Sequence, residues 1–187
     1  MSRAAAVARG RGERDRVPLG DHAAVPSYDD RGDVVALLES QAESRVPELV
    51  PIRYGRMLSS AFAFFRGAAL PMADDLARVP RTGLDVQLCG DAHLANFGVF
   101  GSPERHLVFD INDFDETAPG PFEWDVKRLA ASLEIAGRSN GFKTKARGRV
   151  VRAAVAAYRE AMADFAGRGT LDVGELVTFY GLSAFLL

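Results

Sequence analysis

Two short stretches in the middle of the chain combine residue types and spacing that could do chemistry. The first, residues 84–100, carries Asp91, His93 and Asn96. The second, residues 109–116, adds four carboxylates, which are Asp110, Asp113, Asp115 and Glu116. Converging carboxylates repel one another, so such a cluster is costly as pure structure. It is natural as a site for a hard cation such as Mg²⁺, with bound phosphate completing the coordination.

The local pattern indicates how these groups would meet. Residues 84–88 alternate apolar and polar side chains, as a half-buried strand does, and a short loop follows. Residues 97–100 and 106–111 have the pattern of two strands on either side of a turn. A hairpin brings its two ends together. We therefore expect the carboxylates of the second stretch to lie beside Asp91 and Asn96.

Both stretches resemble parts of known phosphotransferases. Cys89-Gly-Asp-Ala-His-Leu-Ala-Asn96 is similar to the His-Gly-Asp-x-His-x-x-Asn loop of the aminoglycoside and choline phosphotransferases. Ile111-Asn-Asp-Phe-Asp115 resembles their Ile-Asp-Phe-x-Asp segment. The order of these parts is that of a kinase catalytic loop followed by a metal-binding segment. The resemblance implies transfer of a phosphoryl group from ATP to the hydroxyl group of an acceptor.

The same resemblance assigns roles to individual residues. Asp91 would accept the proton of the substrate hydroxyl or orient it, and His93 would fix the shape of the loop. Asn96 and one aspartate of the second segment would hold Mg²⁺ or Mn²⁺ against the ATP phosphates. The Asp-Phe context favours Asp113, with Asp110 as the alternative and Asp115 as a candidate second ligand.

Arg66 is a further candidate for binding the cofactor. It follows an aromatic helix face, where an arginine either extends to water or pairs with acidic groups or a phosphate.

Four segments together resemble the uncharacterised bacterial family called domain of unknown function 2252. They are residues 56–67, 90–98, 109–117 and 124–130, and the resemblance extends from about Arg45 to the end of the chain. Members of that family are longer, with a glycine-rich segment and a strand lysine after the catalytic-loop motif. The resemblance implies that residues 31–187 are the N-terminal part of a kinase-like domain, with its catalytic loop at 89–117 and the nucleotide-gripping lobe absent. Alone, the chain would then bind ATP poorly.

The expected fold is α+β and mostly helical, of the type of a kinase C-lobe, with a small hairpin beside the catalytic loop. Residues 1–30 lack apolar periodicity and are expected to be a disordered or loosely attached arm. Asp125, in the first turn of a helix, is expected to brace the loop. The expected helices span residues 33–45, 53–70, 71–77, 122–138 and 144–166, and a last helix starts at 170 or 172. Asp33 is the expected N-cap of the first of them. The buried side expected for the helix at 122–138 consists of Trp124, Leu129, Leu133 and Ile135.

Composition sets further bounds. The 187 residues are 48% hydrophobic and 26% charged, with a net charge of −2, so nothing favours a nucleic-acid partner. A single cysteine fits a reducing compartment, and no apolar run is long enough to span a membrane. We therefore expect a cytoplasmic protein that acts on a small molecule or another hydroxyl acceptor.

Two other functions fit parts of the pattern. Gly90-Asp-Ala-His93 also resembles a strand end of the metallophosphoesterases, but those sites need several more histidines, and only His22 and His106 remain. A catalytically silent, kinase-like binding module is the second alternative. It is favoured because no Gly-x-Gly-x-x-Gly hairpin is present and the three lysines, Lys127, Lys143 and Lys145, fall on or beside predicted helices.

Overall fold

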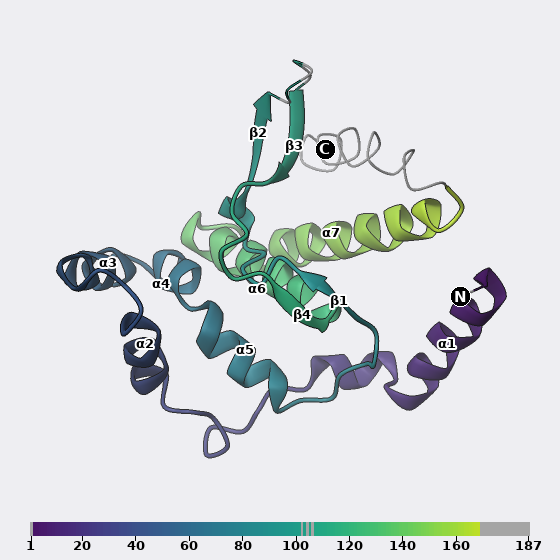
Figure 1. Cartoon of the computed structure of the whole chain (residues 1–187), viewed down its shortest axis with the longest axis horizontal. Coiled ribbons are helices and arrows are strands. Elements are labelled where there is room, and N and C mark those ends of the chain that lie inside the picture. Colours follow the sequence, from purple (N-terminus) through teal and green to yellow (C-terminus); the bar gives the residue numbers. More distant parts are fainter. Residues whose placement is uncertain (1, 102, 104, 106, 169–187) are drawn as a thin grey trace.

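The computed structural model describes residues 2–101, 103, 105 and 107–168. Within them the protein is mostly helical and contains two antiparallel sheets of two strands each, which confirms the expected α+β class. Figure 1 shows the hairpin of β2 (Phe97–Gly101) and β3 (Leu107–Ile111) projecting from a body of helices. Helices α6 (Glu123–Ser139) and α7 (Thr144–Phe165) pack against each other. The last expected helix, from residue 170 or 172, lies outside the described residues.

The N-terminal segment contains helix α1 (Arg3–Arg16) and a short 3-10 helix, η1 (Leu19–Ala23), where the sequence predicts an arm. No residue of α1 is buried, which explains the missing apolar periodicity. The helix is attached by polar contacts with Gly83, 70 or more positions away. Arg9 Nη2 donates to the Gly83 carbonyl at 2.6 Å, and Glu13 Oε2 accepts from the Gly83 amide at 2.9 Å.

Four further α-helices follow before the first strand. They are α2 (Val34–Ala42), α3 (Val50–Met57), α4 (Ala61–Gly67) and α5 (Ala69–Ala77), with a 3-10 turn, η2 (Pro47–Leu49), before α3. The predicted N-cap of α2 is confirmed, because Asp33 Oδ1 accepts from the amides of Val35 and Ala36 at 2.8 and 3.2 Å.

The single helix predicted over residues 53–70 is wrong. The chain leaves the helix after Met57, and Ser60 adopts extended backbone angles and caps α4 by accepting from the Ala63 amide at 3.0 Å. Apolar residues continue at three- and four-residue steps across this break, so periodicity alone could not reveal it. The break makes α3 and α4 two separate helices, which contact each other.

Strand pairing brings together the two ends of residues 89–117, the segment that contains the candidate site. β1 (Asp85–Leu88) pairs with β4 (Ala118–Pro121), so that Leu88 lies opposite Ala118. β2 pairs with β3, and Phe97 lies opposite Ile111. The sequence predicts β1, β2 and β3 but not β4, since its sequence Ala-Pro-Gly-Pro is typical of a loop. Because β1 and β4 pair, both ends of residues 89–117 are held at the same place beside α6.

No helix in the described part of the chain is long and apolar enough to cross a membrane.

The cap of α4 can be tested by replacing Ser60 with alanine. Ser60→Ala removes the side-chain acceptor of the Ala63 amide, so we expect the free energy of unfolding to fall by about 1 kcal/mol. Urea denaturation followed by circular dichroism measures this change. Ser60→Asp, which keeps a capping oxygen, should retain most of the stability. Equal losses in both variants would contradict the role of the cap.

Candidate functional site

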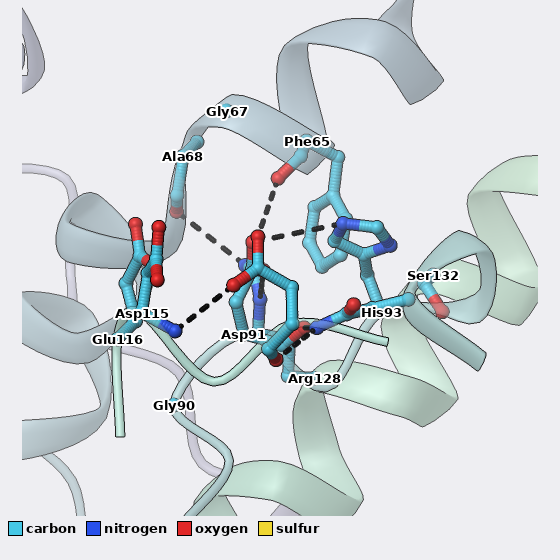
Figure 2. A network of polar contacts seen from close by, with 12 residues as sticks. Phe65, Gly67, Ala68, Gly90, Asp91, His93, Asp115, Glu116, Arg128 and Ser132 are labelled. Carbon is cyan, nitrogen blue, oxygen red and sulfur yellow. Dashed lines mark hydrogen bonds and ion pairs between the residues drawn. The ribbon is translucent and has the colours of Figure 1, made fainter. Parts of the chain in front are cut away.

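A buried ion pair holds the centre of the site. Arg128, on α6, is 3% exposed, and its Nε donates to Asp91 Oδ1 at 2.6 Å, while its Nη2 contacts the same oxygen (Figure 2). Nη2 also donates to the Phe65 carbonyl at 2.9 Å, and the guanidinium carbon lies 4.6 Å from the centre of the Phe65 ring. Nη1 approaches the Ala68 carbonyl at 3.5 Å. One side chain therefore joins the Asp91 loop to α6 and to the α4–α5 junction.

Arg128 is a residue that sequence reasoning missed. An apolar face predicts that α6 buries Trp124, Leu129, Leu133 and Ile135, but in the structure these side chains are half-buried. The fully buried positions of α6 are Glu123, Arg128, Ser132 and Gly137. A signal was present, because Asp125, Arg128 and Ser132 recur at steps of three and four residues and form a polar stripe along one helix face.

The other two members of this stripe also bind the loop. Asp125 accepts hydrogen bonds from the amides of Cys89 and Gly90 at 2.7 and 3.1 Å, and Ser132 Oγ accepts from the Leu94 amide at 2.9 Å. Burial raises the pKa of Asp125 above its usual value, although the two amide hydrogen bonds act in the opposite direction. Asp125 thus has the bracing position expected from the sequence.

Gly90 allows the second segment to approach the loop. Its φ angle is +82°, and a Cβ atom at this position would lie 1.9 Å from the Glu116 carbonyl oxygen. Both the backbone conformation and the contact exclude any larger residue. The closeness of these two backbones is what places Glu116 beside Asp91.

Asn96 and His93 lie within the loop, as the sequence predicts. Asn96 is 5% exposed, and its Nδ2 donates to the carbonyls of Asp91 at 3.1 Å and of Asp113 at 3.0 Å, which ties the two segments together. His93 Nε2 lies 3.6 Å from Asp91 Oδ2. Burial is the main cause that lowers the pKa of His93, so the imidazole is neutral near pH 7.

The loop opens into a polar pocket of about 710 Å³. Its acidic lining comes from the Asp91 loop and from the segment after β3, while its basic lining comes from α3, α4 and the residues after α2. The charged and histidine side chains that line it are Arg45, Arg53, Arg56, Arg66, Asp91, His93, Asp113, Asp115 and Glu116. We call this the charged pocket.

The candidate metal ligands divide into two groups. Asp113 and Asp115 line the charged pocket, and Asp113 Oδ1 accepts from the Asp115 amide at 3.0 Å. Asp110 does not line it, because it pairs with Gly98 in the hairpin, and its Oδ1 accepts from the Ile111 amide at 2.8 Å. Among the described residues, no three His, Cys, Asp or Glu side chains are grouped so that they could hold a metal ion by themselves.

The pKa of Glu116 is affected by burial and by the charged groups around it. Burial raises its pKa above the usual value, and the nearby carboxylates Asp91, Asp113 and Asp115 raise it further. Arg45 has the opposite effect, with its Nη2 at 3.7 Å from Glu116 Oε1. The carboxylates of the charged pocket are thus close enough to repel one another.

Comparison with known proteins places the chain in a family. The family described as uncharacterized proteins conserved in bacteria, domain of unknown function 2252, matches residues 45–184. The chain belongs to this family, which confirms the resemblance seen in the sequence. No curated protein and no solved structure matches it.

The raised pKa of Glu116 predicts a pH-dependent stability. Between pH 4.5, the usual value for glutamate, and the higher value in the folded protein, only the folded state holds the proton. Stability therefore falls as pH rises through this window. Glu116→Gln removes the ionisation, so the variant should be more stable than the wild type at pH 7, and the difference should shrink below pH 4.5.

Thermal unfolding in a metal chelator across this pH range measures the effect. Glu160→Gln, at an exposed position of α7, is the matched control. A Glu116→Gln variant that is less stable than the wild type at pH 7 would show that the ion pair with Arg45 outweighs burial and repulsion.

Proposed function

We propose that the protein is a kinase-like phosphotransferase, which transfers a phosphoryl group from ATP to a hydroxyl group with the help of Mg²⁺ or Mn²⁺. One observation carries this proposal: the charged pocket brings Asp91, Asp113 and Asp115 together with four arginines. Phosphoryl transfer depends on positioning and on electrostatic stabilisation of charged oxygens, so it needs both kinds of group. The order of the catalytic-loop and metal-segment motifs supports the same chemistry.

Asp91 has the environment of a residue that orients a hydroxyl group. Its Oδ1 is held by Arg128, which fixes the carboxylate, and the residue lines the charged pocket. Its Oδ2 lies beyond hydrogen-bond distance from His93 and is the oxygen that would receive the acceptor hydroxyl. Arg128 is a positioning residue in this scheme, because it acts through Asp91.

Asp113 and Asp115, which line the charged pocket, offer the oxygen ligands that Mg²⁺ prefers. Mg²⁺ is usually bound by one or two carboxylates together with waters and substrate phosphates, so a complete protein cage is not required. Asn96 does not line the charged pocket, and its Nδ2 binds the carbonyls of Asp91 and Asp113, so its part would be to position these two segments. The metal would neutralise charge on the ATP phosphates. Asp110 is not part of the proposed set, since it lies outside the charged pocket.

A catalytically silent binding module is the second candidate, and one observation favours it. Asp91 Oδ1 is already occupied by a guanidinium that is 3% exposed, which leaves only Oδ2 for a substrate hydroxyl. Such a module would hold a phosphate-bearing ligand in the same pocket without transferring the group. The metallophosphoesterase alternative finds less support, because His93 is the sole histidine among the described residues that line the pocket.

The role of Asp91 is tested with Asp91→Asn in the full gene product. Loss of a catalytic acid–base group typically lowers the rate about a hundredfold or more, so we expect a loss of at least this size in γ-phosphate transfer from ATP. Asp110→Asn, a matched change outside the pocket, should keep wild-type activity.

The Asp91 variant will also be less stable, since Arg128 loses its counter-ion, and the assay must therefore run well below its unfolding temperature. The sequence alone suggests the opposite, that removing one of several carboxylates relieves repulsion. Full activity of folded Asp91→Asn, or an equal loss in Asp110→Asn, would contradict the proposed role. Metal-dependent ATP binding without any transfer by the wild type would favour the silent module.

A further inference from the structure

Four arginines line the charged pocket, and we call them the arginine wall: Arg45, Arg53, Arg56 and Arg66. Arg53 and Arg56 are three residues apart on α3 and therefore share a helix face. Arg66 is in the last turn of α4, and Arg45 lies between α2 and η2. The break at Ser60, which separates α3 from α4, allows these helices to bring their arginines to one pocket.

Within the described part of the protein, Arg45 is the only member of the arginine wall that forms an ion pair, although Asp113, Asp115 and Glu116 line the same pocket. Arg56 and Arg66 form no ion pair there, and Arg53 Nη2 donates to two neutral groups, Gln41 Oε1 at 3.2 Å and the Gly67 carbonyl at 2.7 Å. Arg45 has its Nη2 3.7 Å from Glu116 Oε1, while its buried Nε has no hydrogen-bond partner in the described residues. The carboxylate of Asp91, which also lines the pocket, is bound by Arg128.

The charge of Arg45 also disfavours the charged form of Arg53. Burial is the main cause that lowers the pKa of Arg53, and the nearby charge of Arg45 lowers it further. Partly buried cations side by side are costly unless an anion lies between them. Arginines that only extend to solvent would not leave a buried Nε without a partner.

We propose that the arginine wall is a binding site for a phosphate group of a ligand. The planar guanidinium presents paired N–H donors that match two oxygens of a phosphate, and several such groups around one pocket suit a dianion. The volume of about 710 Å³ is large enough for a phosphate together with the molecule that carries it. Phosphate binding would supply the missing partner of Arg45 Nε and reduce the repulsion between Arg45 and Arg53.

The phosphate has two possible sources, the nucleotide or an acceptor that is itself phosphorylated. Only this choice rests on the proposed function, because the anion site requires no transfer. A phosphate site in this pocket would restrict the substrate to molecules that carry a phosphate group. The contacts of the four arginines support the site whether or not a phosphoryl group is transferred.

Inorganic phosphate is the probe, titrated into the chain with a metal chelator and without nucleotide. Trp124, the single tryptophan, lines an adjoining cavity of about 310 Å³ that shares Gln41, Ala69 and Glu116 with the charged pocket, so its fluorescence is a suitable reporter. Calorimetry gives an independent affinity.

The test variant is Arg56→Gln combined with Arg66→Gln. Both side chains are exposed and form no hydrogen bond within the described residues, so their replacement should leave the fold intact. Removing two charged donors should weaken phosphate binding about tenfold or more. Arg159→Gln, at an exposed position of α7 outside the pocket, is the matched control and should bind as the wild type does.

Failure to bind phosphate up to tens of millimolar by folded wild-type chain would overturn the proposal, and so would equal affinity in the double variant. Competition assigns the source: displacement of phosphate by ADP with Mg²⁺ indicates the nucleotide, and displacement by glycerol 3-phosphate alone indicates a phosphorylated acceptor. Either result supports the site. The phosphate titration uses neither ATP nor a metal, so the anion site and the transfer function can fail separately.

Discussion

The site depends on the burial of one charge. Arg128 is 3% exposed and contacts the Asp91 carboxylate, the Phe65 ring and two backbone carbonyls at the α4–α5 junction. A buried cation without its counter-ion costs about 3–5 kcal/mol, so Asp91 cannot move away from α6 without a large penalty. The loop, α6 and α4, which carries Arg66 of the arginine wall, are consequently fixed to one another. The charged pocket is the space that this arrangement leaves open.

Local backbone contacts then complete the acidic part of the pocket. Gly90 permits the close approach of Glu116, Asn96 joins the carbonyls of Asp91 and Asp113, and Asp125 accepts from two loop amides. These contacts hold the carboxylate-bearing segments close together. Burial first, and the neighbouring carboxylates second, raise the pKa of Glu116. The structure thus collects acidic groups and cationic groups in one pocket at a cost in repulsion on both sides. A ligand that combines phosphate with a divalent cation would relieve both, which is the physical basis of the proposed function.

The sequence predicted those parts that obey local rules. The first strand, the hairpin and the Asp33 cap follow from residues near one another in the chain, and each is confirmed. The alternating burial expected for the strand is not, because Val86 is exposed. Two features depend on strand pairing, which cannot be deduced from the sequence alone. They are the position of Asp110 opposite Gly98 in the hairpin and the presence of β4. Sequence reasoning missed Arg128 because an arginine is expected at the surface unless its partner, here Asp91, is known. The break before Ser60 was missed because apolar spacing continues through it.

A double-mutant cycle for Asp91 and Arg128 tests the central claim most directly. Urea unfolding is measured for Asp91→Asn, Arg128→Met and the combined variant. If the pair organises the site, each single change should cost about 3 kcal/mol, and the combined variant should lose clearly less than the sum, with a coupling of about 2 kcal/mol. Additive effects, or single losses below about 1 kcal/mol, would contradict the claim that this buried pair holds the loop in place.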